Sequence, residues 1–108
     1  MLKIYLIRKK RQGIWLELPT TLTEIEKANA ALEEIDSEHL VTSIIEASSS
    51  VPELPEYLRG VVVTDQTLME LQFLSLRING MTEQEQSILG AALKIEQPHS
   101  LIEVVNLS

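Results

Sequence analysis

The stretch LKIYLIRKKRQGIWLEL, residues 2–18, decides how the fold begins, because two short alternating segments lie on either side of a glycine. Residues 2–7 and 14–18 each place apolar side chains at every second position, as half-buried strands do. Gly13 readily adopts the backbone conformations of tight turns. The pattern predicts a β-hairpin in even register. Its buried face would contain Leu2, Ile4, Leu6, Leu16 and Leu18, and its second face Tyr5, Ile7 and Trp15.

Four consecutive cations, Arg8 to Arg11, occupy the turn of this hairpin and allow two interpretations. With Tyr5 and Trp15 beside them they could hold phosphates and stack a base. However, residues 13–108 contain 4 basic and 16 acidic side chains, a net charge of −12, whereas nucleic-acid sites usually spread basic charge over several elements. The sequence favours an ordinary polar hairpin end, and direct nucleic-acid binding is not expected.

Beyond the hairpin, residues 20–39 show a helical apolar stripe that begins at Thr21 or Thr23. Residues 39–47 and 60–63 are typical of strands, and the intervening proline-containing segment indicates a loop with one turn of helix near Tyr57. The helices expected after these span residues 64–78, 82–97 and 99–108, with capping boxes at Thr67–Glu70 and Thr82–Glu85 and a stop at Asn79–Gly80.

These elements predict an α+β protein: an N-terminal β-hairpin within a small mixed or antiparallel sheet, one helix, and then two or three packed helices. We expect a small α+β subdomain over residues 1–63 and a helical subdomain over 64–108, joined in one compact unit. The chain has 108 residues, 44% of them hydrophobic, which is enough for one core. With no cysteine, no visible signal peptide and no membrane-length apolar run, a cytoplasmic protein is expected.

Patterns that carry catalysis are missing from the sequence. His39 and His99 each lack a sequence-local partner, and no G-x-S-x-G or S-x-x-K pattern surrounds Ser48–Ser50. Asn79–Gly80 does not resemble a phosphate-binding loop. The sequence therefore predicts no enzyme, no metal site and no cofactor.

Charge is the more informative property. The net charge is −7, and residues 17–56 contain ten carboxylates against a single lysine. A field of this sign repels nucleic acid and attracts cationic partners.

Residues 54–94, LPEYLRGVVVTDQTLMELQFLSLRINGMTEQEQSILGAALK, resemble the ArdA-type antirestriction proteins of conjugative plasmids and transposons. The similarity lies in Thr67 to Leu74 and in the residues that follow as far as Glu85. The opening, with Ile4–Leu6 and Trp15–Pro19, also resembles that family, where a strand precedes a W-x-x-L-P motif and a helix. Full members of the family continue into a further acidic domain, so an isolated module, a diverged relative or one half of a dimer is expected here.

The resemblance implies a DNA mimic of a mobile genetic element, whose carboxylates imitate DNA phosphates and occupy the DNA site of a type I restriction-modification enzyme. The implied partner is thus a protein, with no membrane involved. The candidate partner-binding residues are Glu24, Glu26, Glu33, Glu34, Asp36, Glu38, Glu46, Glu53 and Glu56.

Two alternatives remain open. The first is a protein–protein interaction or regulatory module without antirestriction activity, which uses the wide apolar coverage of residues 68–78 and which could form a homodimer. The second is nucleic-acid binding through the basic residues 8–11.

Overall fold

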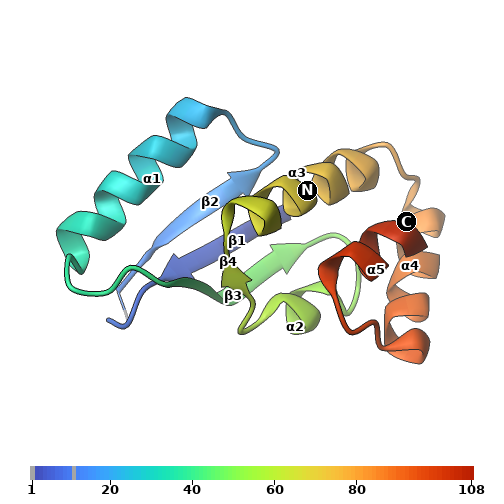
Figure 1. Cartoon of the computed structure of the whole chain (residues 1–108). Helices are drawn as coiled ribbons and strands as arrows, with labels where there is room; N and C mark the ends of the chain where they lie inside the picture. The colour runs from blue at the N-terminus through green and yellow to red at the C-terminus, as the bar shows by residue number, and fades with distance from the viewer. Residues whose placement is uncertain (1, 11) are drawn as a thin grey trace.

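The computed structural model describes residues 2–10 and 12–108 and shows an α+β fold, as the sequence predicts (Figure 1). Within these residues, four strands are interspersed with five helices. In chain order the elements are β1 (Leu2–Ile7), β2 (Ile14–Leu18), α1 (Leu22–Ile35), β3 (Thr42–Ser49), α2 (Leu54–Leu58), β4 (Val62–Val63), α3 (Asp65–Asn79), α4 (Glu83–Glu96) and α5 (Leu101–Leu107).

The strands form a single sheet in the order β2-β1-β3-β4, and every neighbouring pair is antiparallel. The predicted hairpin register is confirmed, because Ile4 pairs with Leu16 and Tyr5 pairs with Trp15. Of the two sheet types that the sequence left open, the antiparallel one is present. β2 lies at one edge, and the two-residue strand β4 lies at the other.

An irregularity in the pairing of β1 with β3 changes what the sheet exposes. Tyr5 is opposite Glu46, but the next residue, Leu6, is opposite Ile44, so Ile45 is an extra residue in β3. Such a bulge locally disrupts the alternation of side chains between the two faces. As a result both Ile45 and Glu46 are exposed, while Ile44 remains fully buried.

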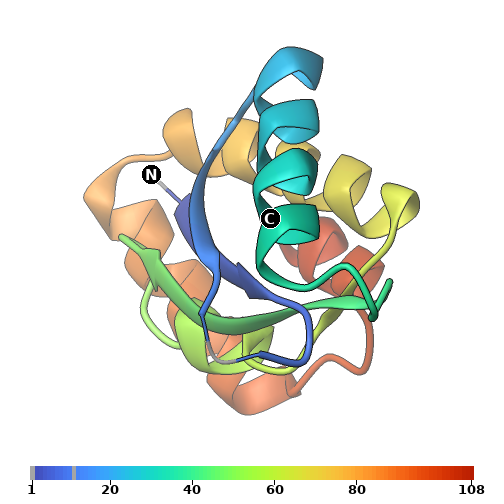
Figure 2. The ribbon, with the colours of Figure 1, turned by 90° about the vertical axis from the view of Figure 1, so that its left-hand side faces the viewer.

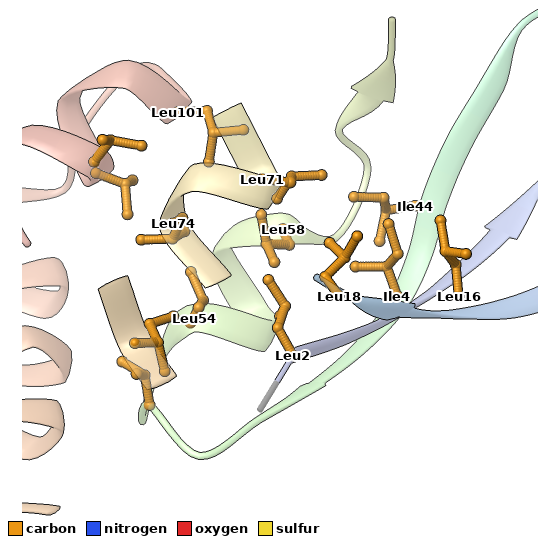
Figure 3. Packing of buried hydrophobic residues seen from close by; sticks show 14 of the residues in the cluster. Leu2, Ile4, Leu16, Leu18, Ile44, Leu54, Leu58, Leu71, Leu74 and Leu101 are labelled. Carbon is orange, nitrogen blue, oxygen red and sulfur yellow. The ribbon is translucent and has the colours of Figure 1, made fainter. Parts of the chain in front are cut away.

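The alternating leucines and isoleucines of the strands meet α2 and α3 (Figure 3), while α5 packs against α3 and α4 packs against α5. Figure 2 shows α1 alongside β2, with α3 and α4 farther from the viewer. The buried cluster joins both predicted subdomains, since it extends from Leu2 in β1 to Val105 in α5. The opposite face of the sheet displays Trp15, Glu17 and Glu46 to solvent.

Threonine side chains cap the three longest helices. The hydroxyl of Thr21 accepts a hydrogen bond from the backbone N–H of Glu24, and Thr82 with Glu85 forms the complete capping box that was predicted. For α3 the predicted capping box at Thr67–Glu70 is wrong, although the helix begins within one residue of the start of the predicted span, residues 64–78. Thr64 is the cap and accepts from the N–H of Thr67, because helical geometry begins one residue after Thr64.

Candidate partner-binding surface

Eight of the nine carboxylates that were predicted to meet a partner are exposed, and the elements of the fold divide them into separate groups. α1 carries four of them, Glu38 follows that helix, Glu46 lies on the open face of the sheet, and Glu53 and Glu56 belong to the α2 region. Figure 1 shows α1 and α2 well apart. The carboxylates therefore do not form a single row, and α1 has the largest group, namely Glu24, Glu26, Glu33 and Glu34.

Two glutamates of α1 pair with cations of the same chain. An oxygen of the Glu33 carboxylate lies 2.6 Å from Nη1 of Arg8, and one of Glu24 lies 3.5 Å from Nζ of Lys27. Within residues 2–10 and 12–108, no comparable ion pair involves Glu26 or Glu34. These two side chains are consequently the members of the α1 group that are most available to an external cation.

The ninth residue, Asp36, does not lie on the predicted acidic surface. Its side chain is buried, and it accepts hydrogen bonds from the backbone N–H groups of Lys9, Glu38 and His39, each at 3.2 Å. Nδ1 of His39 lies 3.0 Å from both carboxylate oxygens. The assignment of Asp36 to partner binding is therefore wrong, because these contacts use its carboxylate to join the end of α1 to the hairpin turn.

Two opposing effects set the pKa of Asp36. Burial acts to raise it, but the hydrogen bond with the His39 side chain and those from the backbone of Lys9 and His39 stabilise the ionised form and lower the pKa to about 2. An aspartate followed by a polar turn is a recognisable local pattern for such backbone contacts. The contribution of Lys9, 27 residues away in sequence, was not visible in the sequence.

Arg8, the first cation of the basic run, is an internal contact of the fold. Its side chain is 9% exposed, and Nη1 donates to Glu33 and, at 3.0 Å, to the backbone carbonyl of Asp36. A cation in this position favourably opposes the negative end of a helix. Lys9 and Lys10 are exposed, and Arg11 lies outside the described residues. The hairpin thus presents less basic surface to a nucleic acid than its sequence suggests.

Glu53 and Glu56 line a hollow of ≈ 290 Å³ that also includes Lys94 of α4. Glu53 has a left-handed backbone with φ of 71°, an uncommon conformation for a residue other than glycine. Tyr57 lies beside them, and burial, with smaller effects from Glu103 and Glu70, raises its pKa. In the described part of the chain, no group of three or more acidic or histidine side chains is arranged to hold a metal ion.

Trp15, which the sequence indicated as a contact only through base stacking beside the basic run, is a prominent residue of the surface. It is half exposed, its ring centre lies 5.1 Å from that of Tyr5, and the Tyr5 hydroxyl accepts a hydrogen bond of 2.9 Å from the N–H of Gly13. Trp15 borders a hollow of ≈ 590 Å³ along β2 and another of ≈ 600 Å³ on the open face of the sheet. The aromatic character of Trp15 was the signal that the sequence offered for this surface.

Apolar side chains also remain on the surface of α3. Met69, Phe73 and Leu76 are 69%, 55% and 59% exposed, and their spacing places them along one side of the helix. The guanidinium carbon of Arg77 lies 5.7 Å from the centre of the Phe73 ring. The wide apolar coverage of residues 68–78 therefore leaves these three side chains outside the buried stripe of α3.

The helices in the described residues are all too short or too polar to cross a bilayer. A comparison with protein-family models, and searches of curated proteins and of solved structures, found no match to this chain. No relative therefore supplies a function, and the surface chemistry of the chain itself is the basis for proposing one.

Proposed function

We propose that this protein is a non-catalytic binding module whose acidic surface on α1 engages a cationic protein partner. The observation that carries the proposal is the exposure of four glutamates on a helix within a segment that has ten carboxylates and one lysine. The resemblance to ArdA-type proteins supplies the specific candidate, a type I restriction-modification enzyme whose DNA-binding cations would contact these carboxylates in place of phosphates.

The charge density of α1 limits how much DNA it could imitate. A helix of 14 residues is about 21 Å long, a length over which duplex DNA carries about 12 phosphate charges. α1 offers four glutamates, and two of them are already paired with Arg8 and Lys27. A partner would therefore use a few cations on this surface, and its binding should depend on salt less steeply than DNA binding does.

Plating of unmodified phage on a host with a type I restriction system tests this proposal. The wild-type protein should raise plating efficiency, and the double variant Glu26→Gln/Glu34→Gln should lose most of that protection, because it removes the available charges and leaves the Arg8–Glu33 pair intact. The matched control Glu83→Gln/Glu96→Gln removes the same charge from exposed positions of α4 and should keep the protection. Unchanged restriction in cells with abundant folded protein would contradict the antirestriction proposal.

A second candidate, an assembly or regulatory module, is favoured by the exposed apolar side of α3. Contiguous apolar surface of this kind frequently marks a contact with another chain. If a second copy covers Met69, Phe73 and Leu76, the mass in solution should rise with concentration, and Phe73→Glu should return the protein to a monomer. A monomeric mass over the whole concentration range would argue against a homodimer at this surface.

A further inference from the structure

β2 is an edge strand, and two of the devices that usually blunt such an edge are missing from it. It pairs with β1 on one side only, so alternate backbone N–H and C=O groups along Ile14–Leu18 face away from the sheet. Proteins commonly protect such edges with lysine or proline within the strand. β2 has neither in its five residues, and Glu17 is its single charge. The opposite edge, β4, has only two residues and offers far less backbone.

Space for an additional chain lies along this edge. The ≈ 590 Å³ hollow is lined by residues 15–21 together with Glu24 at the start of α1 and Asn79 at the end of α3. The ≈ 600 Å³ hollow on the open face of the sheet is lined by Lys3 and Ser48 and shares Trp15 and Glu17 with the first. An extended peptide beside β2 would thus have room for side chains directed to either face.

Two carboxylates and an aromatic ring line the edge and favour basic side chains, while Lys3, opposite Glu17 on β1, adds one cation to the hollow on the open face. Trp15 and Glu17 lie two residues apart and so project on the same face of the strand. A half-exposed indole ring attracts a cation, and the carboxylate of Glu17 can accept a charge-assisted hydrogen bond. Glu24 adds a second carboxylate, and its exposed pair with Lys27, at 3.5 Å, is of the weak surface type that a stronger partner can displace.

We propose that an extended basic segment of the protein partner adds to the free edge of β2 as a further strand. Arginine or lysine at two positions of the segment, separated by one residue, would lie over Trp15 and beside Glu17. Main-chain hydrogen bonds to β2 would supply affinity, and the two cations would supply specificity. This mode of binding rests on the proposed function in one respect, that the partner is a basic protein; it does not require the partner to be a restriction enzyme.

Fluorescence of Trp15, the single tryptophan of the chain, reports binding at the edge directly. The probe is a short synthetic peptide of alternating arginine and valine, which should change this fluorescence saturably and slow hydrogen exchange of the outward amides of β2. The same peptide with alternate backbone nitrogens methylated keeps its charge but loses hydrogen-bond donors on one side. It should bind at least about tenfold more weakly, since a loss of roughly 1.4 kcal/mol is expected from one or two backbone bonds.

A pair of matched variants locates the charge contact. Glu17→Gln should weaken binding of the probe several-fold, whereas Glu83→Gln, with the same change of charge at an exposed position of α4, should leave it nearly unchanged. Equal weakening by both variants, together with equal affinity for the methylated peptide, would reduce the effect to unspecific attraction and overturn the proposal. An absence of any fluorescence or exchange response in the wild-type protein would also overturn it.

Other results separate this proposal from its alternatives. If the β2 amides are protected without peptide and the mass doubles with concentration, a second copy occupies the edge, and the proposed partner strand is wrong. If the probe binds as described but restriction in the plating assay is unchanged, the antirestriction function fails while strand addition stands. If plating efficiency depends on Glu26 and Glu34 but the probe does not bind, strand addition fails while the antirestriction function stands.

Discussion

The helices α1 and α3 belong to the same cluster of packed elements, yet they are held in different ways. α3 buries Leu71, Leu74, Ser75 and Ile78 completely and lies between the sheet and the C-terminal helices. In contrast, α1 buries only Ala28 and Leu32, and it lies at the periphery beside β2 (Figures 1 and 2).

The difference shows where each helix obtains its stability. Burial of a leucine contributes about 1.5–3 kcal/mol, and alanine contributes less, so the two buried residues of α1 supply modest apolar stabilisation. The polar contacts of Arg8 and Asp36 hold the C-terminal end of α1 in place. They therefore contribute a larger share of the stability of α1 than polar contacts contribute to that of α3. Helices with little buried apolar surface open more readily. The proposed acidic surface thus lies on the less strongly packed helix.

The largest effect is expected from truncation of the α3 core. Leu74→Ala removes a fully buried side chain from the centre of the cluster, and the cavity should cost about 2–5 kcal/mol of unfolding free energy. Urea denaturation followed by circular dichroism measures this loss. The control Leu76→Ala changes an exposed leucine of the same helix and should cost no more than about 0.5 kcal/mol. Similar losses in both variants would show that α3 is not packed as described.

The second largest loss of stability is expected from a substitution at Gly90, where α4 closely approaches the loop before α2. A Cβ atom on Gly90 would lie 2.7 Å from the carbonyl oxygen of Pro52, so the loop or the helix must shift to accept Gly90→Ala. Although alanine has a helix propensity about 1 kcal/mol better than glycine, overpacking should make the variant less stable by about 1–3 kcal/mol. Gly80→Ala is the control, because the nearest atom to its Cβ would be the carbonyl oxygen of Arg77, at an ordinary contact distance of 3.5 Å. A gain in stability for Gly90→Ala would contradict the packing.

The parts of this fold that depend on near neighbours in the sequence were predictable. Alternation gave the register of the β1–β2 hairpin, and the Thr82–Glu85 spacing gave the start of α4, because each pattern acts within a few residues. The predicted span of α3, residues 64–78, agrees with the observed start to within one residue, but the predicted capping box at Thr67 is wrong. Thr64 and Thr67 are both good local caps, and the choice depends on where the preceding chain leaves the sheet.

The candidate site was less predictable because tertiary contacts change the role of its charges. Glu33 has an internal partner 25 residues away, and Asp36 receives a backbone hydrogen bond from Lys9 across 27 residues. Neither contact can be predicted from the spacing of neighbouring residues in the sequence. A count of carboxylates therefore overestimates the acidic surface by the residues that the hairpin turn already binds.

Removal of Arg8 should affect α1 more than α3. Arg8→Met keeps most of the apolar stem but loses the hydrogen bonds to Glu33 and to the Asp36 carbonyl, and should cost about 1–2 kcal/mol. Hydrogen exchange should accelerate mainly in the last turns of α1. Lys10→Met, an equal loss of charge at an exposed position, should leave both measurements near wild-type values. Uniform acceleration over α1 and α3 would mean that the two helices open together.

The smallest effect concerns the pH dependence of the same contact. Asp36 has a pKa of about 2 in the folded protein against 3.8 as its ordinary value, so the unfolded chain binds more protons between these limits. Its stabilising contribution is thus present above about pH 3.8 and is lost as the pH falls through 2. Asp36→Asn should be less stable than wild type at pH 6, and the difference in urea midpoint should shrink toward pH 2. A difference that stays constant over this range would show that the ionised carboxylate does not stabilise the junction.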